Sequence, residues 1–565
     1  MANFYLSTAD LRRRIETAPW AAILPALEQD FTDPDELAPR SLEEAVELIQ
    51  ATLELVGEIT AEQIAPHAAE VDREGARLVD GRVLYAEATR REFKILSDAG
   101  LMGFILPREY GGMNFPVTCY TAAVEMVSRA DASLMTIFAL QGCGEVVHRF
   151  GSKEVRQRYL PRLATGEITP CMALTEPNAG SDLGAVAMRA TPDGDRWRLD
   201  GSKCFCTNGG ADLLLVLART EPCGGGEGLS LFAVERSEGV EVAKLESKLG
   251  IHGSPTAFLN FDGALGDLLG TRGGGLYECT MSLLHAVRLE VAAQAVGIAQ
   301  AAQSQAARYA GERRQFGRPI DNFAPVRAML FRNALQIESA RAIVFTTAAI
   351  VDRKRGLLRA GGGTELDRYE RLADLMTPLS KFYACEIVNE VTSRALQVHG
   401  GYGYTTEYPA ERFLRDGRIT NIYEGTSEIQ VGGMIHALVH GGLPLLFEEP
   451  LGDTGEPQSC SGVLDKLRST YAMLLEAAFE AKKADKLGLQ GWARGIAETT
   501  AHLMASLVFL RDAKSDGRSA ILARFKSAET EAGAHRLLRA VKEQDRTLFD
   551  DDSFATIIEP YRSGA

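Results

Sequence analysis

A change of residue pattern along the chain constrains its fold more than any other feature. From residue 46 to 167, apolar residues recur at helical spacing, as in "EFKILSDAGLMGF". Between 168 and 275 the apolar runs are short, rich in β-branched and aromatic residues, and separated by Gly, Asp and Asn, which predicts strands and turns. Long helical patterns return from 276 to 447. We therefore predict a mostly α-helical protein with a central β-domain and a helical bundle behind it.

Three further segments flank this helix–sheet–helix order. With 565 residues the chain is too long for one hydrophobic core. Residues 1–45 are predicted to form an N-terminal extension with one or two short helices. Residues 448–462, "EEPLGDTGEPQSCSG", have the composition of a linker. Residues 463–565 show helical spacing again and predict an additional C-terminal helical domain.

Charge and cysteine usage narrow the possible partners. Lys and Arg total 61 against 76 Asp and Glu, a net charge of −15, which argues against nucleic acid as a partner. The nine cysteines have no framework spacing, and Cys204 and Cys206 are interpreted as strand residues, so no metal site is predicted. No uninterrupted apolar run of membrane-spanning length and no secretory signal is apparent, and we expect a cytoplasmic protein. The mixed charges of 463–565 favour a solvated or subunit-covering face over a membrane-bound one, although membrane contact is possible.

The stretch "RITNIYEGTSEIQ", residues 418–430, holds the candidate for acid–base chemistry. Glu424 follows Tyr423 and precedes a flexible glycine, and Thr426 and Ser427 then offer N-cap hydroxyls to a helix. Glu424 is either an acid that favours the positive end of that helix or a carboxylate held in a pocket as a general base. The stretch alone leaves both open.

Two stretches of the predicted β-domain present hydroxyl and aromatic side chains. In "CMALTEPNAGSD" Thr175 and Ser181 could bond the heteroatoms of a planar cofactor, or the segment could be an ordinary β-turn. In "KCFCTNGG" Phe205 and Thr207 are two apart and are expected on one strand face, as a plate beside a flavin ring or as part of a half-buried strand. Each stretch is a weak signal alone.

Two glycine- or arginine-rich stretches follow long helices. "ERRQFG", 312–317, could clamp a pyrophosphate or simply place cations at a helix C-terminus. "HGGYGY", 399–404, follows a predicted helix instead of a strand, so it is not a dinucleotide-binding fingerprint.

Taken together, these motifs resemble those of the acyl-CoA dehydrogenase family of flavoproteins over roughly residues 45–445. The similar stretches are "TEPNAGSD", "TNGG", "RRQFG", "LQVHGGYGYTTEYP" and "RDGRITNIYEGTSEIQ". The resemblance implies an N-terminal helical domain, a middle β-barrel or sandwich and a C-terminal four-helix bundle, with FAD as cofactor. In placement, 463–565 is similar to the extension of the family's long-chain branch, where extra helices substitute for a second pair of subunits, so a homodimer is expected over a tetramer.

The resemblance also implies roles for individual residues. Glu424 matches the catalytic base; the position that carries the base in another branch of the family is Val287 here, which cannot take a proton. Arg313, Gln315 and Phe316 match positions that reach the FAD of a neighbouring subunit. The complete FAD-binding set is Leu174, Thr175, Ser181, Phe205, Thr207, Arg313, Gln315, Phe316, Gln397, Gly400, Gly401, Thr426 and Glu428. The substrate-binding set is Ser181, Arg288, Tyr423 and Gly425.

The activity implied is α,β-dehydrogenation of an acyl-CoA thioester to the trans-2-enoyl-CoA. Glu424 would take the α-proton, flavin N5 the β-hydride, and an electron-transfer flavoprotein the electrons. An acyl-CoA oxidase and a catalytically quiet assembly or binding member of the family are the alternatives; a ring-hydroxylating flavin monooxygenase would share the fold but not be expected to keep the base. Met135 and Phe138 either line the floor of the acyl pocket or pack in the core.

Overall fold

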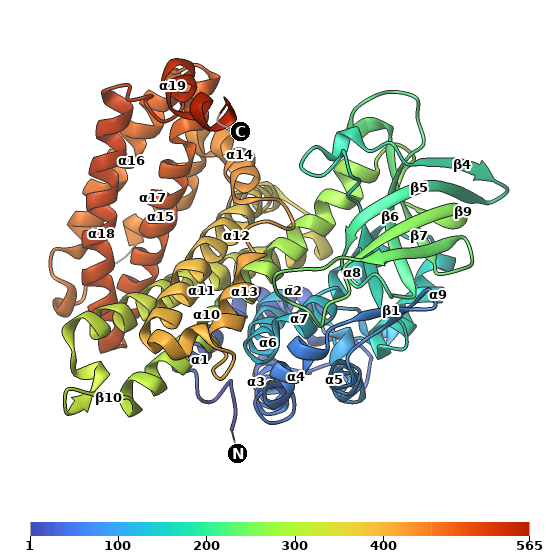
Figure 1. The fold of residues 1–565 in the computed structure, drawn as a ribbon, viewed down its shortest axis with the longest axis horizontal. Helices are drawn as coiled ribbons and strands as arrows, with labels where there is room; N and C mark the ends of the chain where they lie inside the picture. The colour runs from blue at the N-terminus through green and yellow to red at the C-terminus, as the bar shows by residue number, and fades with distance from the viewer. Residues whose placement is uncertain (1, 454, 564–565) are drawn as a thin grey trace.

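The computed structural model describes residues 2–453 and 455–563, and its β-domain lies at one side of a mostly helical molecule (Figure 1). The N-terminal extension holds the two short helices expected there. Ser41 caps the first long helix, its Oγ accepting from the Glu44 N–H at 3.2 Å. The helices of the first 165 residues are α1 Ala9–Glu16, α2 Trp20–Leu27, α3 Leu42–Ile59, α4 Ala68–Glu74, α5 Glu87–Asp98, α6 Val117–Ala130, α7 Ala132–Phe138, α8 Gln141–Phe150 and α9 Lys153–Thr165.

A short hairpin interrupts this helical region and was not predicted. Strands β1 (Arg77–Val79) and β2 (Arg82–Leu84) pair antiparallel around Asp80 and Gly81, both at positive φ. At three residues each, the strands are too short for the alternation of polar and apolar residues to be visible in the sequence.

The β-domain is a seven-stranded sheet in the order β3-β6-β4-β5-β9-β7, with β8 added to β9. Because β7 also pairs with β6, the strands β6, β4, β5, β9 and β7 form a closed ring, which confirms the expected barrel. The stretch "PDGDRWRLDG" forms the antiparallel β4–β5 hairpin. The strands are β3 Pro170–Ala173, β4 Arg189–Asp193, β5 Arg196–Cys206, β6 Leu213–Arg219, β7 Leu229–Glu235, β8 Val240–Leu245 and β9 Ala257–Leu269.

Long helices form the bundle at the centre of the molecule, between the β-domain and the C-terminal helices (Figure 1). The loop 360–363, which holds three glycines at positive φ, reverses the chain between α11 and α12. A small hairpin, β10 Arg314–Gln315 and β11 Arg318–Pro319, follows α10. The helices are α10 Met281–Glu312, α11 Ala324–Arg359, α12 Thr364–His399, α13 Ala410–Arg418 and α14 Ser427–Ala437.

The chain ends in further helices that pack beside the bundle, as expected for 463–565. The predicted linker is only partly a linker, because α15 (Leu443–Asp453) extends into it before the short turn Gln458–Cys460. Leu446, Phe447 and Leu451 are buried, and this apolar face carries the helix past the position where Pro and Gly suggested an end. The last helices are α16 Val463–Lys483, α17 Lys486–Asp512, α18 Gly517–Lys542 and α19 Asp551–Ser563.

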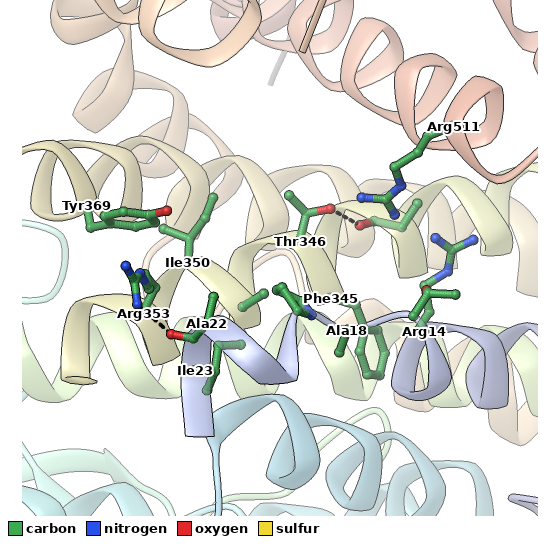
Figure 2. Close-up of a pocket in the computed structure, with 14 residues that line it drawn as sticks. Arg14, Ala18, Ala22, Ile23, Phe345, Thr346, Ile350, Arg353, Tyr369 and Arg511 are labelled. Atoms are coloured by element: carbon green, nitrogen blue, oxygen red, sulfur yellow. Dashed lines mark hydrogen bonds between the residues drawn. The ribbon is translucent and has the colours of Figure 1, made fainter. Parts of the chain in front are cut away.

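Ion pairs join the N-terminal extension to these C-terminal helices. Arg14 of α1 lies 2.6 Å from Asp512 of α17, and both side chains are buried. Arg13 forms a second pair with Asp516 at 2.9 Å. Figure 2 shows Arg14 of α1 and Arg511 of α17 on opposite sides of a pocket whose floor includes Phe345 of α11. Helices α1 and α17 therefore meet beside α11 of the bundle.

Among the described residues, three helical stretches are long and apolar enough to cross a membrane by length and composition alone: Gly275–Glu312, Ala324–Arg359 and Ser427–Glu448. No uninterrupted apolar run marks these stretches in the sequence, because scattered polar residues divide each one. In the first two, 72% and 67% of the most apolar window is buried inside the protein, and in the third 50%. Their apolar faces are largely used in packing the bundle.

Candidate active site

A cavity lies where the β-domain meets the bundle, and residues of four sequence-distant segments line it. It is lined by Glu424, Gly425, Arg288, Leu284, Ile429, Met172, Leu174, Thr175, Gly180, Ser181, Leu183, Cys204, Phe205 and Thr207. The predicted base, five of the predicted cofactor-binding residues and three of the predicted substrate-binding residues are thus brought together in one cavity.

Glu424 sits in a loop whose backbone is held in an uncommon conformation. Its φ is +55° and that of Gly425 is +90°, so two consecutive residues lie in the left-handed region. A Cβ at Gly425 would come within 2.6 Å of Gln430 Nε2, so only glycine fits there. Such a conformation persists when surrounding groups fix it, and it is typical of functional loops.

Side chains from three helices fix the carbonyl oxygens of this loop. Lys381 of α12 donates its Nζ–H to the Gly425 carbonyl at 2.8 Å, and the side chain of Lys381 is buried. Gln430 of α14 donates to the carbonyls of both Glu424 and Gly425, at 3.1 and 3.0 Å. Arg288 of α10 donates to the Glu424 carbonyl at 3.4 Å. With the carbonyls held, the Glu424 side chain is directed into the cavity.

Burial raises the pKa of the Glu424 carboxyl above its ordinary value of 4.5, while the positive charges of Lys381 and Arg288 oppose that rise. No described residue donates a hydrogen bond to this carboxylate. The burial makes it a stronger base than an exposed glutamate, and the two cations keep it ionisable. Of the two interpretations left open by the sequence, a base in a pocket fits this environment better than an acid at a helix end.

The backbone N–H of Glu424 is a free donor beside the carboxylate. Within the described part of the chain it donates no hydrogen bond, whereas the neighbouring Tyr423 N–H donates to Ile419 at 3.1 Å. An unused N–H next to a general base is the arrangement that stabilises a developing oxyanion.

The wall of the cavity opposite Glu424 comes from the β-domain and suits a flat aromatic ring with polar edges. Phe205 is 64% exposed, which is unusual for a large apolar side chain and leaves its ring free to cover a partner. The hydroxyls of Thr175, Ser181 and Thr207 donate to no described residue, so they are free to bond ring heteroatoms. The residues therefore fit the flavin that the sequence implies.

The prediction that strand alternation places Phe205 and Thr207 on one face is wrong, although both residues line the cavity. Strand β5 ends at Cys206, its register shifts between Lys203 and Cys206, and Phe205 has φ +57°. The two side chains therefore do not share a face by strand alternation. Instead the strand bends and turns them together, and Asn208 fixes the turn by donating to the Pro170 carbonyl at 2.9 Å.

A second buried carboxyl, Glu290, lies near Glu424 and was not singled out in the sequence. It is on α10, two residues beyond Arg288, and is 4% exposed. Burial raises its pKa well above 4.5, and the charges of Glu145 and Glu424 add to the rise. Glu290 does not line the cavity. Its burial therefore favours the neutral form of this carboxyl, which lies outside the cavity.

A second cluster of predicted residues lies at the other end of α10. Arg313, Gln315, Gly400 and Gly401 line one open pocket, together with Tyr309 and Tyr402. Arg313 is 25 residues beyond Arg288, or about 37 Å along a helix at 1.5 Å per residue. One chain therefore does not bring the two clusters together.

The remaining predicted residues lie outside both pockets. Phe316 is 93% exposed, and Gln397 is exposed at the end of α12. Thr426 caps α14, and Glu428 pairs with Arg494 of α17 at 2.6 Å. The Tyr423 hydroxyl donates to Gln294, which orients the ring behind the base. Met135 and Phe138 are buried, with Phe138 against the rings of Phe104 and Tyr120, so core packing accounts for them.

Lys381, Gln430 and Glu386 also shape the site and were missed. Lys381 occurs in an ordinary helical pattern, and its only sequence signal is a lysine among apolar neighbours in "LSKFYA".

Among the described residues, no group of three or more His, Cys, Asp or Glu side chains could hold a metal ion.

The protein thus combines, in one cavity between the β-barrel and the helix bundle, a carboxylate, an unused backbone N–H and an exposed aromatic ring. Comparison with known proteins identifies its class. The models of the acyl-CoA dehydrogenase N-terminal, middle and C-terminal domains match residues 47–167, 171–264 and 273–438. The chain therefore belongs to the acyl-CoA dehydrogenase family, a family of oxidoreductases.

Individual relatives agree with this assignment. The probable acyl-CoA dehydrogenase FadE25 of Mycobacterium tuberculosis is 38% identical over 67% of this chain and 92% of its own length. The short-chain specific acyl-CoA dehydrogenase of Clostridium acetobutylicum is 36% identical over 67% of this chain and 94% of its own. Butyryl-CoA dehydrogenase from Megasphaera elsdenii is similar in structure, with TM-score 0.62, 32% identity, and coverage of 70% of this chain and 98% of its own.

The C-terminal helices also have a structural counterpart. An acyl-CoA dehydrogenase complexed with FAD from Bacillus anthracis covers 91% of this chain and 90% of its own, with TM-score 0.75 and 24% identity. The likeness at that identity shows a shared fold that includes most of the added helices.

Proposed function

We propose that this protein is an FAD-dependent acyl-CoA dehydrogenase that converts an acyl-CoA thioester to the trans-2-enoyl-CoA. The observation that carries the proposal is the half-buried Glu424, which lines a cavity together with Phe205 and three free hydroxyls. When bound there, FAD supplies the acceptor for the β-hydride at its N5 atom.

The residues of the chain supply the proton chemistry. Glu424 accepts the α-proton of the thioester, and its free backbone N–H stabilises the negative charge that develops on the thioester oxygen. The positive charges of Lys381 and Arg288 favour the ionised form of this carboxylate. With cofactor and substrate filling the cavity, water would be displaced from it, and the charge stabilisation would be stronger than in solution. Thr175, Ser181 and Thr207 would hold the cofactor by its polar edge.

A second copy of the chain would complete the cofactor site. Arg313 directly follows α10, about 37 Å from Arg288, and Gln315 lies next to it in β10, so we propose that they bind the FAD of a partner subunit. The exposed rings of Phe316 and Tyr404, 93% and 87% accessible, suit a surface that a partner covers. Since the C-terminal helices pack on the bundle, a homodimer is favoured over a tetramer. A cytoplasmic location is part of this proposal.

The electron acceptor is proposed to be an electron-transfer flavoprotein. A solved structure described as electron transferring flavoprotein of Acidaminococcus fermentans includes a chain that resembles this one, with TM-score 0.62, 34% identity and coverage of 98% of that chain. The relatives named above are dehydrogenases, which supports this acceptor over oxygen.

Anaerobic mixing of the FAD-loaded protein with a panel of acyl-CoAs tests the proposal. At least one thioester should bleach the flavin absorbance and yield a product lighter by two hydrogens. The bleached enzyme should then reduce an electron-transfer flavoprotein faster than it forms peroxide in air; rapid peroxide formation would instead identify an oxidase. A protein that binds no flavin, or flavin that no acyl-CoA bleaches, would contradict the proposal and support a binding role.

A further inference from the structure

Arg494 of α17 connects the C-terminal helices to the loop that carries Glu424. Its guanidinium contacts three carboxylates: Glu386 of α12, Glu428 of α14 at 2.6 Å and Glu498 of α17 at 3.1 Å. It also lies 5.2 Å from the ring centroid of Phe382, one turn before Glu386 on α12. The matched family domains end at residue 438, so Arg494 belongs to the added part of the chain.

Glu386 transmits this contact to both ends of the loop. One of its oxygens, Oε2, accepts from Arg494. The other, Oε1, accepts from the Ser427 hydroxyl at 2.5 Å and from the Asn421 amide at 3.1 Å. Ser427 and Asn421 bracket Glu424, and the Ser427 N–H donates to the Asn421 carbonyl at 3.2 Å. A single carboxylate therefore closes the loop on one side and binds the C-terminal helices on the other.

The charge of Arg494 keeps Glu386 in the form that makes these bonds. Glu386 is partly buried, at 27% side-chain exposure, which raises its pKa, but hydrogen bonds from Ser427, Asn421 and Arg494 bring the pKa below its ordinary value. Without Arg494, the carboxylates of Glu386 and Glu428 would face each other with no cation between them. Repulsion between these two carboxylates would then act at the start of α14, close to the turn formed by Glu424 and Gly425.

The loop depends on such external support because Glu424 and Gly425 both have positive φ. Lys381 and Gln430 hold its carbonyls, whereas Glu386 holds its two ends. A displacement of about 1 Å in a reacting group can cost a hundredfold in rate. The ends of the loop thus matter for the position of the base.

We propose that Arg494 is a positioning residue through which the C-terminal helices hold the Glu424 loop in its reactive geometry, acting by way of Glu386. The inference rests on the proposed function of Glu424 and assigns the added helices a part in catalysis beyond covering the bundle.

Replacing Arg494 should leave the C-terminal helices in place, because other contacts hold them. Arg14 pairs with Asp512, Arg518 with Glu338, and Lys526 donates to the Tyr383 hydroxyl at 3.2 Å. Arg494→Gln therefore tests the loop contact, and circular dichroism and gel filtration check that the fold and assembly are kept.

Single-turnover bleaching of bound FAD by a saturating acyl-CoA measures the effect. Arg494→Gln should slow the bleaching rate roughly ten- to hundredfold with little change in the acyl-CoA concentration for half-maximal rate, and Arg494→Lys should recover part of the loss. Glu386→Gln should slow bleaching similarly, and Arg494→Gln added to Glu386→Gln should have little further effect. Arg539→Gln, an exposed arginine on α18 paired with Glu543, is the matched control and should bleach at the wild-type rate.

The outcomes separate this inference from the proposed function. If the wild type is bleached and Arg494→Gln is bleached equally fast, the positioning role is wrong while the dehydrogenase assignment stands. Strictly multiplicative losses in the double variant would also overturn it, because Arg494 would then not act through Glu386. If no acyl-CoA bleaches the wild type, the proposed function itself fails.

Discussion

The two ends of α10 carry motifs of the same family in opposite surroundings. At the Arg288 end, the base loop is enclosed by three helices and a β-barrel, and its carbonyls are bonded within the chain. At the Arg313 end, the pocket is open, and Phe316 beside it is almost fully exposed. The difference supports the proposal that one chain supplies the proton chemistry, whereas a second copy of the chain completes the cofactor site.

The largest expected effect is at the enclosed end. Glu424→Gln keeps the size of the side chain but cannot accept a proton, so turnover should fall by about 10²- to 10⁴-fold while FAD stays bound. Steady-state rates with the best acyl-CoA measure turnover, and the flavin-to-protein absorbance ratio measures the bound FAD. Glu290→Gln is the matched control: it changes another buried carboxyl, which does not line the cavity, and should leave turnover within about twofold. Near-normal turnover in Glu424→Gln would refute the assignment.

A smaller effect of a different kind is expected at the open end. Arg313→Gln removes a charge proposed to bind the partner's FAD, so FAD should dissociate roughly ten- to a hundredfold more readily, while turnover at saturating FAD is kept. Titration of the apoprotein with FAD measures the affinity. Arg308→Gln, one turn earlier and exposed on the same helix, is the control. Unchanged FAD affinity in Arg313→Gln would contradict the proposal that the Arg313 end of the bundle binds the FAD of a partner subunit.

The pKa of Glu424 gives a further test of the enclosed end. Because burial raises the pKa of Glu424, turnover should fall as pH drops through a value above 4.5, by about tenfold per pH unit below it. The charge of Lys381 lowers that pKa, so Lys381→Gln, which can still donate to the Gly425 carbonyl, should move the acid limb to higher pH. The pH dependence of the bleaching rate in Lys381→Gln tests this prediction. An acid limb that stays in place or moves to lower pH would exclude the role of the Lys381 charge in lowering the pKa of Glu424.

The smallest expected effect concerns the helix that follows the base. Thr426 Oγ1 accepts from the Ile429 N–H at 3.4 Å and caps α14. Thr426→Ala should lower the free energy of unfolding by about 1 kcal/mol, and Thr426→Ser should restore it. Urea denaturation measures the change. A loss of turnover far larger than the loss of stability would indicate that Thr426 contacts the cofactor directly, as the family resemblance implies.

Much of the fold was predictable because it depends on local periodicity. The helical spacing of 276–447 and the short β-rich runs of 168–275 each reflect which face of an element is buried. The Glu424 loop was also predictable, since its glycine, cap and acid are adjacent in "YEGTSEIQ". In contrast, the extent of α15 was misjudged because its Pro and Gly residues suggested a break that burial of Phe447 overrides.

The supports of the site could not be predicted because they join residues far apart in sequence. Arg494 and Glu386 are separated by 108 positions, and Lys381 reaches a carbonyl 44 positions away. Both occur in ordinary helical patterns, so no local signal marks them. The kink at Phe205 depends similarly on the register shift between β5 and β9.

Exchange of the α-hydrogens of a bound thioester with deuterated water tests the central claim most directly. An acyl-CoA with sulfur in place of the β-carbon has acidic α-hydrogens but no β-hydrogen to transfer, so it isolates proton removal. Mass spectrometry should show deuterium entering the α-position with the wild type and with Glu290→Gln, but not with Glu424→Gln. Exchange at the wild-type rate in Glu424→Gln would show that another group removes the proton.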